Sequence, residues 1–361
     1  MTQSSQSPLA PLDLVVPNVK RRFSGITSTT IQVLTELAPL LKVAVYRHPL
    51  PTLENLPLLS FLELIRHTRS RTSSDRPVIY HARRNDDMIL GLILKKVFRR
   101  NIHLIFTSVA QRQHSWITRF LYWKMDTLLS TSDRSASYLH RTPCHIVPHG
   151  IDTQLFHPPS DRSSLWAEAG LPGRYAIGIF GRIRPSKGTD VFINALLETL
   201  PLYPDFTAVV LGETRPEFKS FQAKLAQKIA DAGLTHRVVW LGKRPFEEIP
   251  IWFRRMSLVA AVSRSEGFGL TCLEAMASGV PVIATQTGAF ESIVRPGIDG
   301  EVIPVNDPRA LVKAFHTLLS NPSRLETMGR AARKNILQNF TIEKESQELL
   351  NLYRLIQRKC H

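Results

Sequence analysis

Short apolar segments alternate with longer segments of helical period along most of the chain, and this alternation strongly constrains the fold. The apolar segments are predicted strands at residues 12–17, 41–46, 77–80, 102–107, 128–132, 175–180, 206–212, 237–242, 258–262, 282–284 and 300–304. Strands that alternate with helices form parallel sheets with helices on both faces. The sequence therefore predicts an α/β protein whose ligand-binding loops follow the carboxyl ends of its strands.

A segment rich in proline and glycine, residues 157–173, separates two runs of predicted strands and is expected to be a linker. The chain has 361 residues, of which 43% are hydrophobic, so it is long and apolar enough for two globular domains. We predict two Rossmann-like parallel-sheet domains that face a central cleft. Their boundaries are expected at residues 1–160 and 161–340, with a last helix at residues 341–361.

Composition also bears on the compartment in which the chain works. No apolar stretch reaches eighteen residues, so no membrane-spanning helix is expected. The first eight residues contain neither a basic nor an apolar region of the kind found in signal peptides. The three cysteines, Cys144, Cys272 and Cys360, are far apart, which favours a reducing cytoplasm over a disulfide framework or a zinc site.

The formal net charge of +16 favours anionic partners. Nucleic acid, an anionic membrane surface and phosphorylated substrates all meet this condition, and charge alone does not choose between them. Two predicted helical segments, residues 85–100 and 111–124, combine apolar and basic side chains. They either pack in the core, with bases that suit a helix dipole, or meet lipid head groups.

The stretch from Arg264 to Thr285 reads as a loop, a helix and a strand. Gly267 and Gly269 allow a tight turn, and a helix is predicted from Leu270, whose first turn can bind phosphate through its free N–H groups. Two acids, Glu266 and Glu274, lie on either side of this turn. Because the helix is otherwise apolar, each acid is expected to need partners such as hydroxyl groups.

A second loop with phosphate-binding potential follows the predicted strand at residues 175–180. It contains Gly181, Arg182 and Lys187, and its two cations can bind phosphate oxygens. The loop is neither a Walker motif nor a dinucleotide fingerprint. In the first half, Gly25 lies in the loop between the first predicted strand and a helix, which is another candidate ligand-facing turn.

The two acids and the sequence that joins them resemble the E-x7-E signature of family 4 retaining glycosyltransferases, which have the GT-B fold. The loop with Arg182 and Lys187 is similar to the G-R-x4-K-G element of that family. The resemblance implies that Glu266 holds the donor sugar, that Glu274 holds the donor ribose, and that the C-terminal helix returns to the first domain. It also implies that Arg182 and Lys187 neutralise the donor diphosphate. The expected catalytic residues are Arg182, Lys187 and Glu266, and the expected donor-binding residues are Gly25, Gly181, Arg182, Lys187, Glu266, Gly267, Phe268, Gly269, Leu270 and Glu274.

The first 150 residues resemble lipopolysaccharide inner-core mannosyltransferases in three segments, residues 15–28, 81–85 and 107–114. The resemblance implies GDP-mannose as the donor and a Kdo-bearing lipid A precursor, an anionic glycolipid, as the acceptor. It implies a peripheral location at the cytoplasmic face of the inner membrane. The expected acceptor-side residues are His81, Arg83, Ser108 and His114.

The family resemblance implies front-face attack with retention, in which the leaving phosphate takes the acceptor proton. No Asp-x-Asp motif occurs in the cleft segments, so transfer is expected to need no metal or other cofactor. One alternative is the same fold with UDP-glucose or another nucleotide sugar and a different acceptor. A remote alternative is a non-enzymatic nucleic-acid-binding protein, but no nucleic-acid-binding motif occurs, so no nucleic-acid partner is expected.

Overall fold

The computed structural model describes residues 12–20, 25–68 and 76–359. The chain divides into two compact units, one formed by the residues up to Gly150 together with those from Ile342 onward, and the other by Ile151–Thr341. The first boundary therefore precedes the expected linker at residues 157–173. Some expectations concern parts of the chain outside the described residues: the N-terminal tail, residues 21–24 of the first acceptor segment, residues 69–75, and Cys360.

The first unit contains a seven-stranded parallel sheet with the strand order β3-β2-β1-β4-β5-β6-β7. Its strands are β1 (Leu14–Asn18), β2 (Val43–Arg47), β3 (Leu58–Leu59), β4 (Val78–Ala82), β5 (Ile102–Ser108), β6 (Thr127–Ser130) and β7 (His145–Ile146). Central strands such as β1 and β4 are buried throughout, as expected for a sheet covered on both faces.

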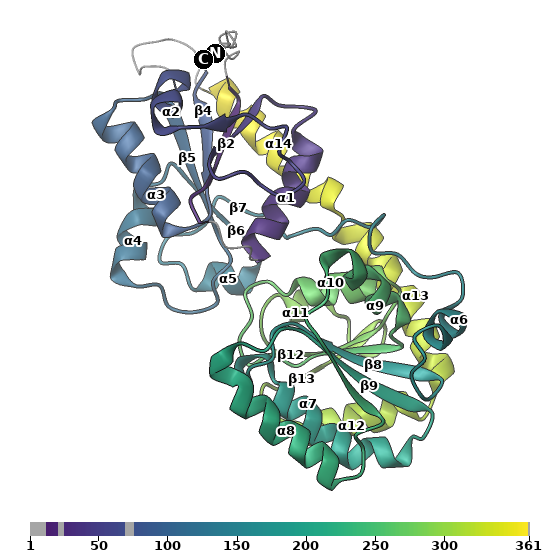
Figure 1. Cartoon of the computed structure of the whole chain (residues 1–361). Helices are drawn as coiled ribbons and strands as arrows, with labels where there is room; N and C mark the ends of the chain where they lie inside the picture. Colours follow the sequence, from purple (N-terminus) through teal and green to yellow (C-terminus); the bar gives the residue numbers. More distant parts are fainter. Residues whose placement is uncertain (1–11, 21–24, 69–75, 360–361) are drawn as a thin grey trace, which may run out of the picture. The chain divides into compact units, whose positions relative to one another are not determined.

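Helices cover both faces of this sheet (Figure 1). On one face lie α1 (Gly25–Leu37) and α14 (Ile342–Lys359), which share a hydrophobic core with the sheet. On the other lie α2 (Phe61–His67), α3 (Asn85–Leu92), its π-helical continuation η1 (Ile93–Val97) and α4 (Trp116–Trp123). The short helix α5 (Asp133–Ser137) follows β6. Helix α14 thus returns to the first unit, which confirms the prediction for the C-terminal helix.

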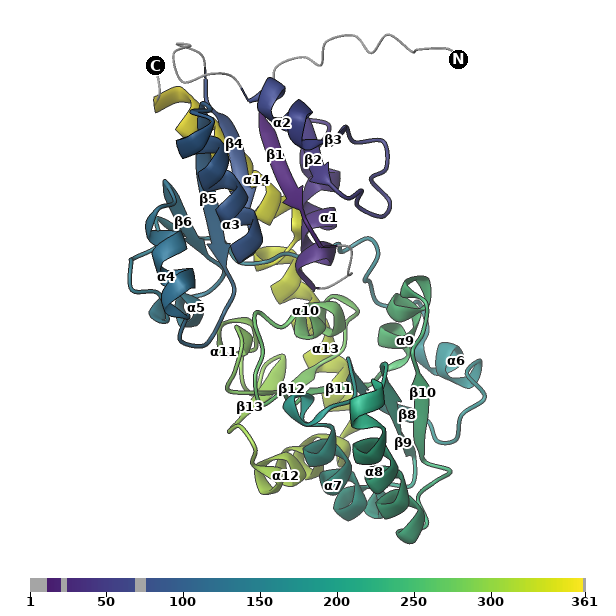
Figure 2. The same ribbon diagram turned by 60° about the vertical axis from the view of Figure 1, so that its left-hand side comes forward.

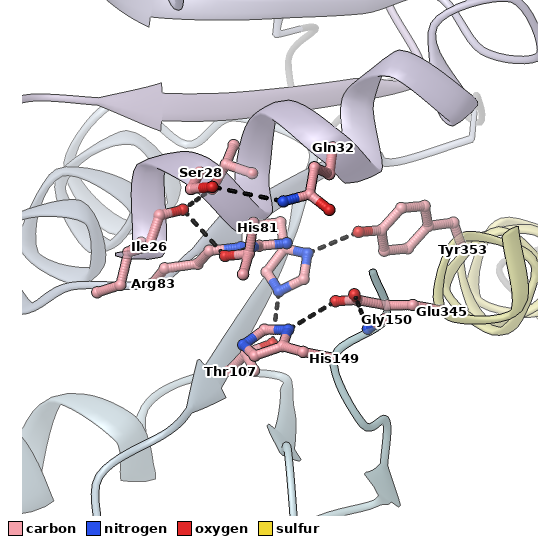
Figure 3. Close-up of polar contacts among 12 residues, drawn as sticks. Ile26, Ser28, Gln32, His81, Arg83, Thr107, His149, Gly150, Glu345 and Tyr353 are labelled. Atoms are coloured by element: carbon pink, nitrogen blue, oxygen red, sulfur yellow. Dashed lines mark hydrogen bonds and ion pairs between the residues drawn. The ribbon is translucent and has the colours of Figure 1, made fainter. Parts of the chain in front are cut away.

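Two residues that follow β7, His149 and Gly150, anchor this returning helix. The Glu345 carboxylate, which is buried, accepts a hydrogen bond from the Gly150 N–H at 2.8 Å and contacts His149 Nδ1 at 2.8 Å (Figure 3). These contacts attach α14 to His149 and Gly150, the residues at which the chain leaves the first unit for the second.

Two local predictions for the first unit are wrong in detail. The helical period of residues 58–67 predicts a single helix, but in the structure β3 ends at Leu59 and Ser60 caps α2 in a capping box with Glu63. Asn85, at the start of the predicted helix at residues 85–100, is a candidate N-cap by residue type, but in the structure it is the first helical residue of α3 and its side chain donates to Thr118 Oγ1 instead.

The second unit contains a six-stranded parallel sheet with the strand order β10-β9-β8-β11-β12-β13. Its strands are β8 (Tyr175–Phe180), β9 (Phe206–Leu211), β10 (Val238–Gly242), β11 (Leu258–Ala261), β12 (Val282–Thr285) and β13 (Gly300–Ile303). The two parallel sheets confirm the predicted fold class.

Helices also cover both faces of the second sheet (Figure 2). One face packs against α7 (Thr189–Thr199), α8 (Lys219–Asp231) and α12 (Pro308–Leu319). The other packs against α6 (Arg162–Ala167), α9 (Ile249–Arg255), α10 (Leu270–Ala277), α11 (Phe290–Ile293) and part of α13 (Pro322–Asn339). Short 3-10 turns, η2 (Pro185–Lys187), η3 (Leu200–Leu202), η4 (Pro216–Phe218) and η5 (Phe246–Glu248), complete the unit. Within the described residues of both units, none of the helices combines the length and the apolar content needed to cross a bilayer.

Candidate active site

The two loops singled out in the second half of the sequence meet at the carboxyl edge of the second sheet. Strands β8 and β11 are parallel neighbours, so the loops that follow them emerge side by side. The loop after β8 leads through η2 to Lys187, and the loop after β11 leads through Glu266 to α10. A small pocket between them is lined by Ile179, Phe180, Lys187, Ala260, Ala261, Val262, Ser263, Glu266, Thr271 and Phe290.

An ion pair between Lys187 and Glu266 lies in this pocket. The Lys187 ammonium contacts Glu266 Oε2, and both side chains are about one-fifth exposed. Ser263 Oγ lies 3.4 Å from the same carboxylate oxygen. The two side chains therefore neutralise each other's charge. An incoming anion can take the place of the carboxylate on Lys187, which leaves Glu266 to accept hydrogen bonds from hydroxyl groups.

Two glycines allow these loops to approach their neighbours closely. Gly188, directly after Lys187, has φ +72°, and a Cβ there would lie 1.9 Å from the carbonyl oxygen of Val262. Gly269 is the N-cap of α10 with φ +107°, and a Cβ there would lie 2.0 Å from the ring of Phe290. Only glycine fits these two positions, because each combines a left-handed backbone with a close neighbour.

The N-terminus of α10 borders the pocket through Thr271. The first N–H groups of a helix have no intrahelical acceptor, and the helix dipole makes this end favourable for anions. Phe268 is buried, and its carbonyl accepts a hydrogen bond from Ala289 N at 2.8 Å, which fixes the loop before the helix. Gly267 and Leu270 complete the turn around Gly269. This arrangement can bind a phosphate group next to Lys187.

Glu274 lies one turn into α10, close enough to the ion pair to interact electrostatically with it. Burial raises the pKa of its carboxyl to about 7; the charge of Lys187 opposes this rise and the charge of Glu266 adds to it. The Glu274 carboxyl is therefore close to half protonated at neutral pH, and it can both donate and accept hydrogen bonds.

This raised pKa predicts a specific pH dependence of stability. The folded state keeps the Glu274 proton up to about pH 7, whereas the unfolded chain releases it near the ordinary value of 4.5. Between these values the unfolded state binds fewer protons, so stability is lost as the pH rises. Glu274→Gln cannot ionise, so it avoids this loss of stability. We expect it to be more stable than the parent by about 2 kcal/mol at about pH 8, which is less than the full difference in pKa would give because the side chain is partly solvated.

Urea unfolding at about pH 5 and about pH 8 measures this difference. The two proteins should be nearly equally stable at the lower pH and should diverge at the higher one. Glu247→Gln, which removes a carboxylate from an exposed position on η5, controls for the change in net charge. An equal stability difference at both pH values would contradict the assignment of the raised pKa to Glu274.

Arg264 joins the two loops of the site, a role that the sequence did not reveal. Its guanidinium forms a two-pronged contact with Asp190, at 2.7 Å to each oxygen, and it also donates to the Pro185 carbonyl. Its Nε donates to Asn306 Oδ1 at 2.9 Å. The backbone N–H of Arg264 donates to the Ser186 carbonyl at 2.9 Å. The residue therefore holds the turn that carries Lys187 against the loop that carries Glu266.

We expect Arg264→Ala to lower nucleotide affinity by about tenfold, because the two loops then lose their common attachment. Arg264→Lys should restore little, since an ammonium group cannot reproduce the two-pronged contact. Arg324→Ala removes a partly exposed ion pair with Glu301, which lies on β13, and is the matched control. A positioning role predicts a larger change in KM for the donor than in kcat, whereas loss of the whole fold would appear in the thermal midpoint of unfolding.

The remaining predicted residues of the second unit also border this edge of the sheet. Gly181 has φ +117°, and a Cβ there would lie 3.6 Å from the Lys187 side chain. Arg182 follows it and is half-buried, with no hydrogen bond or ion pair to another described residue. Its guanidinium therefore remains available for a ligand.

Except for His81, the predicted residues of the first unit lie in or next to the segments that follow β1, β4 and β5. Gly25 begins α1 and has open space around it. Arg83 donates to Thr29 Oγ1 on α1 at 3.3 Å. Ser108, at the end of β5, lies 3.3 Å from His114 Nε2, and burial lowers the pKa of His114.

His81 is the predicted residue whose surroundings differ most from the expectation. It is buried inside β4, with one ring nitrogen 2.6 Å from the Tyr353 hydroxyl and the other 2.7 Å from Thr107 Oγ1 (Figure 3). Burial holds its pKa well below the usual range. Both nitrogens are engaged within the first unit, so the ring ties α14 to the sheet and has no free nitrogen to offer an acceptor.

Comparison with protein families finds a match to the model described as glycosyl transferases group 1, over residues 167–335. The chain is 40% identical to the lipopolysaccharide core biosynthesis mannosyltransferase LpcC of Rhizobium leguminosarum bv. viciae, over 95% of this chain and 96% of the relative. It is 37% identical to the lipopolysaccharide core biosynthesis mannosyltransferase LpsB of Rhizobium meliloti, over 96% of this chain and 98% of the relative.

Two solved structures are similar to the chain. The C-terminal domain of a glycosyl transferase group 1 family protein, LpcC from Francisella tularensis, is 38% identical, with a TM-score of 0.52 over 53% of this chain and 99% of that domain. The Anabaena protein Alr3699/HepE in complex with UDP has a TM-score of 0.81 at 21% identity, over 94% of this chain and 99% of that protein. The second likeness concerns the fold alone.

Proposed function

This chain belongs to the group 1 family of glycosyltransferases, and from that premise we propose that it transfers mannose from GDP-mannose to the Kdo-lipid A inner core of lipopolysaccharide. The observation that carries the proposal is the similarity, over nearly the full length of both proteins, to two lipopolysaccharide core mannosyltransferases. The pocket of the second unit supports the reaction type, because it combines a cation, a helix N-terminus and a carboxylate at one edge of a sheet.

We assign the donor to this pocket. Negative charge builds on the departing diphosphate as the glycosidic bond breaks, and Arg182, Lys187 and the first turn of α10 stabilise it. Glu266, once Lys187 has turned to phosphate, accepts hydrogen bonds from hydroxyls of the donor sugar, and Glu274 accepts them from the ribose. We propose front-face attack with retention, in which the leaving phosphate accepts the proton of the acceptor hydroxyl.

These protein cations are the groups we expect to offset the diphosphate charge, so we propose that transfer needs no metal. The test is activity before and after treatment with a chelator. A reversible loss of activity that added divalent cation restores would overturn this part of the proposal.

We propose that the acceptor is lipid-borne and anionic, and that the enzyme works as a peripheral protein on the cytoplasmic face of the inner membrane. The net charge of +16 supports an anionic acceptor and an anionic membrane surface. Nucleic acid is not proposed as a partner.

A thermal-shift comparison of GDP, UDP and ADP tests the donor first. Preferential stabilisation by GDP, followed by transfer from GDP-mannose to a Kdo-lipid A acceptor, is the expected result. A preference for UDP would keep the reaction type and replace the donor, which would favour UDP-glucose or a related sugar. No stabilisation by any of the three nucleotides would overturn the assignment of the donor site.

A further inference from the structure

The first unit presents an apolar surface on the helices that cover one face of its sheet. On α3 and η1, the side chains of Ile89, Ile93 and Val97 are exposed at a spacing of four residues, which aligns them along one side of the helix. The opposite side of the same helix is already used, since Met88 and Leu94 are fully buried against the sheet. The exposed stripe of Ile89, Ile93 and Val97 is therefore not needed to pack this helix against the sheet.

Helix α4 carries a second outer stripe made of aromatic residues. Trp116, Phe120 and Trp123 have 71%, 57% and 54% of their surface exposed, while Leu121 and Tyr122 on the same helix are buried. The aromatics were expected either to fill the core or to meet lipid head groups. The structure excludes the core for these three side chains, because it is filled from the other side of α4.

The two stripes belong to one surface. Helices α3 and α4 contact each other, and Asn85 Nδ2 donates to Thr118 Oγ1 at 2.9 Å between them. At the other end of η1, the ring of Phe98 packs against that of Phe61 on α2, with ring centroids 5.6 Å apart. Both views show these helices on the same side of the first sheet (Figures 1 and 2). We call this surface the apolar face.

Basic side chains surround the apolar face. Lys96 and Arg99 are exposed at the end of η1, and neither forms an ion pair with a described residue. Lys124 follows α4, with its ammonium 5.5 Å from the centroid of the Phe120 ring. Long basic side chains beside exposed aromatics are typical of helices that lie in a membrane interface.

The acids on these helices do not cancel this charge. Glu63 is held by the N-cap of α2 through Ser60, and Asp126 is bound by Lys95. Asp86, at the start of α3, lies 3.1 Å from Lys20, and Asp87 is buried and accepts a hydrogen bond from the Arg83 N–H at 3.1 Å. The charges that remain without a partner among the described residues around the apolar face are therefore positive.

We infer that the apolar face docks on a phospholipid bilayer that contains anionic lipids, with the α4 aromatics at the level of the head groups. Large contiguous apolar surfaces are uncommon on monomeric proteins, and the basic border selects an anionic bilayer over an apolar protein partner. The inference rests on the proposed function in one respect: an enzyme whose acceptor is lipid-borne must reach the membrane surface.

Vesicle co-sedimentation tests the inference with the full-length chain. Vesicles of phosphatidylcholine mixed with phosphatidylglycerol should bind the protein, and pure phosphatidylcholine should bind it much less. Trp116→Ser combined with Trp123→Ser should weaken binding by about tenfold or more. Lys96→Glu combined with Lys124→Glu should remove the preference for the anionic lipid. Tryptophan emission should shift to the blue on binding, because Trp116 and Trp123 are exposed on the apolar face, whereas Trp166 and Trp252 are buried and Trp240 is half-buried in the second unit.

The matched control is Leu202→Ser, which removes an exposed apolar side chain from the second unit and should leave vesicle binding unchanged. Equal binding by the tryptophan double variant, or no binding by the parent at low ionic strength, would overturn the inference. So would a parent that is dimeric without lipid and becomes monomeric in the double variant, because a second copy would then cover the face. The assay contains neither donor nor acceptor, so its failure is distinct from failure of the proposed function, which nucleotide binding tests separately.

Discussion

Lys187→Ala is expected to lower kcat/KM for glycosyl transfer by about 10²–10³-fold, the range associated with loss of one group that stabilises charge in a transition state. Lys187 is the cation that borders the pocket, and its only anionic partner among the described residues is Glu266. The substitution removes the charge that we assign to the diphosphate and leaves the carboxylate of Glu266 unpaired beside it. Both changes disfavour an anionic ligand.

The measurement that isolates this effect is the thermal shift produced by a nucleoside diphosphate, compared between the parent and the variant. The unfolding midpoint without ligand is a poor guide, because loss of the ion pair also changes stability. Glu266→Gln separates the two effects: it breaks the ion pair while keeping Lys187, so nucleotide binding should persist although transfer of the sugar is impaired.

Lys228→Ala is the matched control, since Lys228 lies on α8 in the same unit and, among the described residues, its ammonium donates only to the side chain of Asn194. It should bind nucleotide as the parent does. A full nucleotide-induced shift in Lys187→Ala would contradict the assignment of the diphosphate to this pocket.

The family resemblance assigned Lys187 and Glu266 to one donor site, and the fold supplies a physical reason why they meet. Each residue follows a predicted strand, and parallel strands release their loops at the same edge of a sheet. The order of the strands then decides which loops are neighbours, and the structure places β8 beside β11. Glycines at positions 188 and 269 were visible in the sequence, but the atoms that exclude a side chain there, Val262 and Phe290, were not.

Contacts between distant segments could not be predicted in this way. Arg264 lies in the loop after β11 and Asp190 lies in the first turn of α7, and their pairing depends on the packing of two elements that are far apart in the chain. His81 follows a predicted strand and was assigned to the acceptor side. The strand continues to Ala82, so His81 lies within the sheet and bonds to Tyr353 on a helix from the other end of the chain.

Exposure was equally hard to predict for α4. Its sequence has apolar residues all around the helix, which is compatible with complete burial. Only the packing of the helix on the sheet decides which of its two apolar sides is left outside, and in the structure the outer side holds Trp116 and Trp123.

Gly188→Ala should be the most destabilising of the substitutions considered for the second unit. A Cβ at this position would lie 1.9 Å from the carbonyl oxygen of Val262 and 2.9 Å from its carbon, and these backbone atoms cannot rotate away as a side chain can. The left-handed backbone conformation adds its own cost for alanine. We expect a loss of about 2–5 kcal/mol in the free energy of unfolding, from strain and overpacking together.

The consequence for function follows from the position of Gly188 in the chain. The residue directly follows Lys187, and Val262 directly precedes the loop that leads to Glu266, so relief of the clash must move the two loops apart. Nucleotide affinity should therefore fall along with stability, by about tenfold or more. Urea unfolding and nucleotide titration, both at a temperature where the variant is folded, measure the two effects separately.

Gly233→Ala distinguishes the clash from the backbone strain. Gly233 has φ +69°, almost the same as Gly188, but a Cβ there would meet nothing within 4 Å. Gly233→Ala should lower the free energy of unfolding by only about 1–2 kcal/mol, the cost of the left-handed conformation alone. It should leave nucleotide binding unchanged. If the two variants are equally stable, the close approach between Gly188 and Val262 does not hold the loops together, and another contact, such as that of Arg264, must do so.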